Sequence, residues 1–126
     1  MVITIEEMIS GKYLNEDNNM PIIKFNKLVR DRIPEIIEIN GKRCVWSTLS
    51  EEDYLVYLDE KLNEELVEYQ QSKSMEELAD LIEVIRAVVV ARGYSIEKVE
   101  ALRRDKAEKR GRFEKRILLT EVRSEE

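Results

Sequence analysis

The chain of 126 residues contains no histidine and a single cysteine, Cys44. One cysteine cannot form a disulfide within the chain, and a zinc site built on several thiolates or on imidazoles is excluded. The absence of histidine also excludes a di-iron site of the Glu-x-x-His type. Any metal bound by this protein is therefore expected to have oxygen ligands.

Long apolar runs and helix-breaking residues are also scarce. No apolar run approaches the roughly twenty residues of a membrane-spanning helix, and the N-terminus lacks the pattern of a signal peptide, so we expect a cytoplasmic protein. Four glycines and two prolines, with 43% hydrophobic and 38% charged residues, predict a helix-rich globular protein. The net charge of −6 argues against general nucleic-acid binding.

The length predicts one domain. Residues 1–19 are weakly patterned and end in a polar run, so they are interpreted as an N-terminal extension, and 20–126 as a single all-α domain. A short helix is expected to begin at Pro34 and to end near Asn40 and Gly41.

Three serines mark the starts of longer helices. Ser50, Ser74 and Ser95 each precede an acidic first turn and a helical pattern, as N-cap residues do. Gly93 and Gly111 are expected to end the second and third of these helices. The predicted fold is an all-α helical bundle built on an antiparallel hairpin of two long helices, with a third helix, a short N-terminal helix and an extended C-terminal tail.

Acidic residues crowd the expected hairpin between residues 63 and 80. At 100° per residue, Glu65 and Glu68 flank the apolar stripe of the first long helix, whereas Glu64 points away from it. Glu77 and Asp80 lie to one side of the stripe on the second helix, which consists of Leu78, Ile82, Ile85 and Val89. A short turn would bring the two carboxylate pairs to the same end of the hairpin.

Two interpretations of these acids remain open from the residues alone. A solvated acidic face is the common one, because the chain has 27 acidic residues and helical spacing between some of them is expected by chance. The other is a cation site. Like charges a few ångströms apart repel by about 4 kcal/mol at an effective dielectric near 20, so a cluster beside an apolar surface must hold protons or cations. Mg²⁺ or Mn²⁺ suits an all-carboxylate set.

Four strings in this order carry a resemblance to a known family. EELVE (64–68) followed by ELAD (77–80) resembles the EExxE and ExxD pair of the MazG-type all-α nucleoside triphosphate pyrophosphohydrolases. KLVRDRIPEII (27–37) and EKRGRFEKRI (108–117) resemble the opening and closing motifs of its small phosphoribosyl-ATP pyrophosphohydrolase-like subgroup. The likeness covers residues 20 to about 122. The chain departs from the pattern at Arg112, where the subgroup often has a second glycine, and in the short gap between the acidic motifs.

The resemblance implies a Mg²⁺-dependent enzyme, with Mn²⁺ as a possible substitute, that hydrolyses a nucleoside triphosphate to the monophosphate and pyrophosphate, a reaction suited to house-cleaning of the nucleotide pool. It implies Glu64 as an acid that supports the metal ligands. A carboxylate that is not committed to metal, Glu64 or Glu68, is the candidate catalytic residue that orients or deprotonates the attacking water. The implied metal ligands are Glu65, Glu68, Glu77 and Asp80. The candidate phosphate-binding residues are Lys27, Arg30, Lys106, Lys109 and Arg110.

Three further expectations concern partners and alternatives. A domain this small with so apolar a second helix needs more cover than one chain supplies, so we expect a homodimer or a higher homo-oligomer. One alternative function is a non-catalytic acidic helical module that docks a regulatory partner. Another is hydrolysis of phosphoribosyl-ATP within the same superfamily. No P-loop string or nudix box is present.

Overall fold

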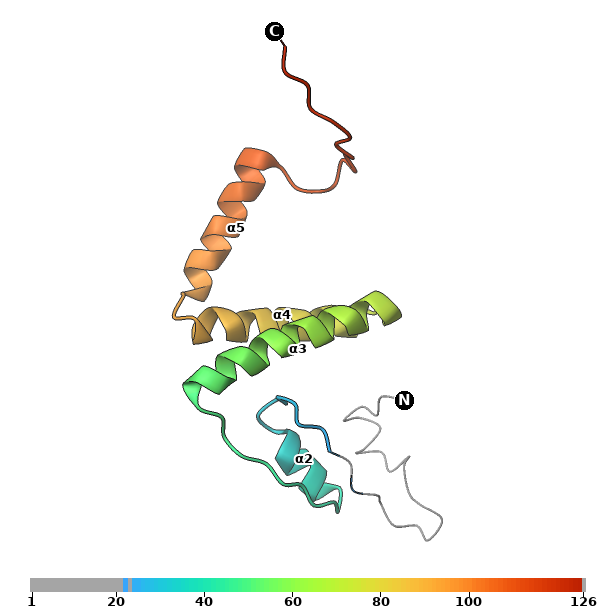
Figure 1. The fold of residues 1–126 in the computed structure, drawn as a ribbon, viewed down its shortest axis with the longest axis vertical. Coiled ribbons are helices and arrows are strands. Elements are labelled where there is room, and N and C mark those ends of the chain that lie inside the picture. Colours follow the sequence, from blue (N-terminus) through green and yellow to red (C-terminus); the bar gives the residue numbers. More distant parts are fainter. Residues whose placement is uncertain (1–21, 23, 126) are drawn as a thin grey trace.

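The described part of the chain, residue 22 and residues 24–125 of a computed structural model, is all-α (Figure 1). Its helices are α2 (Ile33–Ile39), α3 (Glu51–Ser72), α4 (Met75–Ala91) and α5 (Ile96–Arg110), and these residues contain no strand. The predicted fold class is confirmed. The expected N-terminal extension, 1–19, lies outside the described residues.

The three long helices begin where the sequence predicts. The hydroxyls of Ser50, Ser74 and Ser95 each accept a hydrogen bond from the backbone N–H three residues on, at 3.2, 3.4 and 3.2 Å. Each bond satisfies one of the amides that a helix N-terminus leaves free, which is worth about 1 kcal/mol per cap. Local chemistry therefore sets these helix starts.

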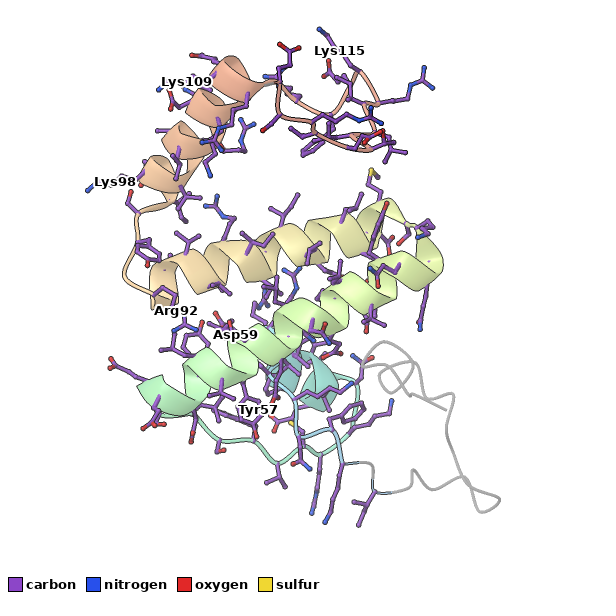
Figure 2. All side chains as sticks on the ribbon, turned by 45° about the horizontal axis from the view of Figure 1, so that its top comes forward. Tyr57, Asp59, Arg92, Lys98, Lys109 and Lys115 are labelled. Atoms are coloured by element: carbon purple, nitrogen blue, oxygen red, sulfur yellow. The ribbon has the colours of Figure 1, made fainter. Side chains whose placement is uncertain are left out.

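A very short turn joins α3 to α4. Lys73, in the left-handed region with φ of 59°, follows the last residue of α3, and the next residue, Ser74, already caps α4. So short a connection makes the two helices antiparallel neighbours, and they lie side by side (Figure 1). Near the other end of the hairpin, Arg92 Nη2 lies 3.0 Å from Asp59 Oδ2, a pair labelled in Figure 2.

The apolar core of a single chain is very small. Among the described residues only Leu58, Val84 and Val89 are buried apolar side chains. On α4, Val84 and Val89 are buried, whereas Leu78, Ile82 and Ile85 of the predicted apolar stripe remain 41%, 58% and 43% exposed. One chain therefore leaves much of this apolar helix uncovered.

The C-terminal part of the chain leaves the hairpin. Helix α5 contacts α4 near the turn between them and then rises at a steep angle from it (Figure 1). Gly111, with φ of 82°, follows the end of α5, and every residue from 108 to 125 is exposed. The tail is an extended arm. No described helix has the length and apolar character that crossing a membrane requires.

Candidate metal and phosphate site

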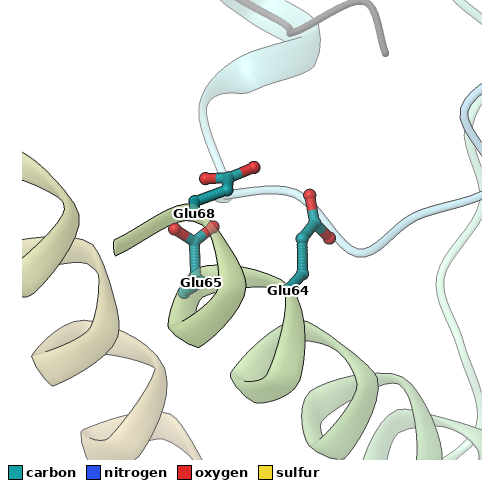
Figure 3. A group of neighbouring side chains, drawn as sticks. All are labelled: Glu64, Glu65 and Glu68. Carbon is teal, nitrogen blue, oxygen red and sulfur yellow. The ribbon is translucent and has the colours of Figure 1, made fainter. Parts of the chain in front are cut away.

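Five carboxylates meet at the turn end of the hairpin. Glu64, Glu65 and Glu68 of α3 can bring one oxygen each to within 4.8 Å of one another, and Glu65 forms a second such triad with Glu77 and Asp80 of α4. Figure 3 shows the α3 members, with the carboxylates of Glu65 and Glu68 close together. The i, i+3 and i, i+4 spacing within a helix and the antiparallel pairing place these groups.

Glu65 lies at the centre of both triads and is itself buried. Its residue is only 5% exposed, and its Oε1 atom is 3.3 Å from Lys61 Nζ. Its Oε2 atom is buried and has no hydrogen-bond partner among the described residues. A buried polar atom left without a partner costs about 1 to 3 kcal/mol, and more when it is charged. This oxygen therefore lacks a hydrogen-bond donor or a cation beside it.

Glu68 shows the same deficit of positive charge. Burial raises the pKa of Glu68 from 4.5 to about 7, helped by the negative charge of Glu65, by the hydrogen bond that a protonated Glu68 could donate to Glu65, and by the charges of Glu77 and Glu64. In the absence of a cation, the Glu68 carboxyl therefore holds a proton at a pH where most glutamates have lost theirs.

Two predicted phosphate-binding residues lie against these acids. Lys27 Nζ is 3.3 Å from Glu64 Oε1, and Arg30 Nη2 donates a hydrogen bond of 2.7 Å to Asp80 Oδ1. Both basic side chains are partly exposed, at 39% and 58%, so they can turn toward an incoming anion. The segment before α2 thus brings basic residues to the rim of an acidic site.

Two features of this site differ from the sequence-based expectation or were missed by it. Glu64 was expected to point away from the other acids, but it is half-buried within the cluster, with Lys27 Nζ 3.3 Å from its Oε1 atom. Lys61 was missed. It lies 3.6 Å from Glu64 Oε1 and 3.3 Å from Glu65 Oε1, and its position three and four residues before these acids was the available signal.

The other three predicted phosphate-binding residues are not at the acids of their own chain. Lys106, Lys109 and Arg110 are exposed on the half of α5 that is remote from α4 (Figure 2). Lys109 Nζ instead lies 3.1 Å from Asp105 Oδ2 on the same helix. The reason is the course of α5, which carries these side chains away from the hairpin.

The donor set fits a hard divalent cation. All five groups are carboxylates, the ligands preferred by Mg²⁺, Mn²⁺ and Ca²⁺. The unpartnered Glu65 oxygen and the raised pKa of Glu68 both mark a place that lacks positive charge. Glu65, Glu68, Glu77 and Asp80 could hold such an ion, with Glu64 beside them.

Comparison with known proteins assigns no family to the chain. No protein-family model and no solved structure matches it. Among curated proteins, an uncharacterized protein of Mycolicibacterium smegmatis is 52% identical over 42 residues. That stretch is 33% of this chain and 43% of the relative, so the chain spans less than half the length of the curated relative it matches. The match carries no activity with it.

Proposed function

We propose that this protein is a Mg²⁺-dependent hydrolase that converts a nucleoside triphosphate to the monophosphate and pyrophosphate. The observation that carries the proposal is Glu65, a buried carboxylate with an unpartnered oxygen, shared by two acidic triads. A merely solvated acidic face would leave its oxygens in water. The resemblance of both acidic motifs to those of MazG-type pyrophosphohydrolases supports the same chemistry.

The metal would be held at the turn end of the hairpin. Glu65 would anchor it, because this side chain belongs to both triads, and Glu68, Glu77 and Asp80 would supply the remaining protein oxygens. When bound, Mg²⁺ supplies neutralisation of phosphate charge and activation of water. Without it, a triphosphate would be repelled by the five carboxylates gathered here.

Glu68 and Glu64 are the candidate bases. A pKa near 7 in the ion-free protein allows Glu68 to take up a proton at neutral pH. A cation against Glu65 would lower the pKa of Glu68, and the Glu68 oxygen that does not contact the ion could then accept the proton of the attacking water. Glu64, held by Lys27 and Lys61, is placed to orient that water.

Lys27 and Arg30 would bind the phosphate chain. In the free protein they lie against Glu64 and Asp80, and an incoming phosphate oxygen competes for the same cationic groups. Exchange of Arg30 from a carboxylate to a phosphate would release Asp80 to the metal. We assign the activity to the cytoplasm, where hydrolysis of triphosphates would serve nucleotide-pool house-cleaning.

The deciding experiment measures pyrophosphate release from a panel of nucleoside triphosphates and phosphoribosyl-ATP, with Mg²⁺ or with EDTA. We expect Mg²⁺-dependent release by the wild type and a loss of at least about 100-fold in Glu68→Gln, as for removal of a general base. The matched control is Glu83→Gln, an exposed acid on α4 outside both triads, which should keep wild-type activity.

Two outcomes would count against this function. If the wild type releases no pyrophosphate from any substrate and calorimetry detects no Mg²⁺ binding, the hydrolase proposal fails and a non-catalytic docking module becomes the better explanation. If phosphoribosyl-ATP alone is hydrolysed, the chemistry stands and the substrate changes.

A further inference from the structure

The outer face of the hairpin is apolar and uncovered. Leu78, Ile82 and Ile85 repeat at helical spacing along α4, on the side away from α3. Farther along, an open depression of about 310 Å³ lies at the turn into α5, and Tyr94 and Leu102 are among its lining residues. A stripe of this kind on a helix normally packs against another element.

The C-terminal segment is also apolar and uncovered, and it carries positive charge. We call residues 103–122 the basic arm. From 103 to 118 it has eight basic and three acidic residues. Its large apolar side chains are between 74% and 98% exposed. They are Phe113, Ile117, Leu118, Leu119 and Val122.

Helix α5, whose second half belongs to the basic arm, leads the arm away from its own hairpin (Figure 1). Fifteen residues of helix span about 22 Å. The helix is polar on nearly all sides, as expected for a solvated spacer rather than a packed core helix. The hairpin, residues 51–91, has twelve acidic and three basic residues, so arm and hairpin are complementary in charge as well as in apolar surface.

We propose that the occupant of the outer hairpin face is the basic arm of a second copy of this chain. Two copies exchange arms, so that the apolar residues of each arm pack on Leu78, Ile82 and Ile85 of the partner. Such an exchange is symmetric, and every contact occurs twice. It supplies the cover that the described residues lack within one chain, since only three of their apolar side chains are buried.

Arm exchange also completes the acidic site. The basic residues that stand clear of their own acids, Lys106, Lys109 and Arg110, approach the partner's carboxylates and bind the phosphates there. This catalytic part rests on the proposed function, whereas the docking itself does not.

Sedimentation equilibrium tests the docking without any activity. The wild type should sediment at twice its mass of 14.9 kDa. Ile117→Asp with Leu118→Asp should sediment as a monomer, and since both side chains are at least 80% exposed within one chain, their change leaves its own fold intact. Val45→Asp, fully exposed outside the arm, is the matched control and should remain dimeric. A monomeric wild type, or a dimeric double variant, would overturn the proposal.

Cross-linking separates exchange from folding back. A Cys44→Ser chain carrying both Ile82→Cys and Leu118→Cys is treated with a short bis-maleimide. Arm exchange gives a covalent dimer, whereas an arm that folds back on its own α4 gives a cyclised monomer, which would refute exchange. Mass spectrometry of the linked peptides distinguishes the two products.

Subunit mixing tests the catalytic part. Glu68→Gln and a Lys109→Ala, Arg110→Ala chain should each be inactive, and a refolded equal mixture should recover about a quarter of wild-type activity, because half the dimers are mixed and each has one intact site. No recovery, with dimers intact, would overturn the contribution in trans. A wild type without activity would refute the proposed function. Sedimentation and cross-linking would still show whether the arms are exchanged.

Discussion

Glu68→Gln should stabilise the protein when no metal is bound. In the folded chain the pKa of Glu68 is about 7, against 4.5 as its ordinary value, so the ionised form is unfavourable in the folded state. Between these two pH values the folded state binds more protons than the unfolded state. Stability from this group therefore falls as pH rises from about 4.5 to 7 and is constant above that.

The size of the effect follows from the shift. One pKa unit corresponds to about 1.4 kcal/mol, which gives about 3 kcal/mol for the whole shift. Glu68 is half-buried, so solvent screening reduces this to about 1 to 2 kcal/mol. For a domain of this size the variant should melt roughly 3 to 8 °C above the wild type at pH 8 in EDTA. At pH 4.5 the two should melt together.

Thermal melts followed by circular dichroism from pH 4.5 to 8.5 check the predicted difference in melting temperature. Glu83→Gln is the control, and its melting temperature should equal that of the wild type at every pH. Magnesium should reverse the order, because an ion bound at 100 times its Kd adds about 2.7 kcal/mol to the folded state and the variant binds it less tightly. A variant that melts with or below the wild type at pH 8 in EDTA would refute the idea that this carboxylate is held at an electrostatic cost.

Other predictions address the cap, the turn and the rim of the site. Ser74→Ala should lower the free energy of unfolding by about 1 kcal/mol in urea titration, while Ser47→Ala, outside any helix, should leave it unchanged. Lys73→Gly should raise the free energy of unfolding by about 1 kcal/mol, because glycine adopts φ of 59° without strain. A lower free energy of unfolding would show that the lysine side chain stabilises the turn by more than the strain costs. Arg30→Met should tighten Mg²⁺ binding in calorimetry, because Asp80 is freed, and should raise the KM for triphosphate, because a phosphate-binding group is lost. Equal weakening of Mg²⁺ binding and triphosphate binding would contradict the idea that Arg30 moves from Asp80 to the phosphate.

The helices were predictable because their limits are local. Ser50, Ser74 and Ser95 accept the expected amides, and Gly93 and Gly111 follow helix ends with positive φ. The meeting of Glu65 and Glu68 with Glu77 and Asp80 was predictable as well, since helical periodicity fixed their side of each helix and the short turn fixed the pairing. The place of Glu64 in this cluster was not predicted, because periodicity alone points it away from the apolar stripe.

The course of α5 was not predictable from the sequence. A helix that is polar on nearly all sides has no apolar face that selects a packing direction, so the placement of Lys106, Lys109 and Arg110 had no local determinant. The ion pairs of Lys27 and Arg30 could not be predicted from the sequence either. They depend on where an irregular segment crosses the hairpin, and no residue pattern encodes that crossing.

Because the connection at Lys73 is so short, its length fixes how α4 is rotated about its own axis relative to α3. Each residue inserted there would rotate α4 by 100° about its axis, so a single insertion would swing Glu77 and Asp80 out of reach of Glu65 without altering any carboxylate. The length of a loop usually varies freely in helical proteins, but here the geometry of the acidic site depends on it.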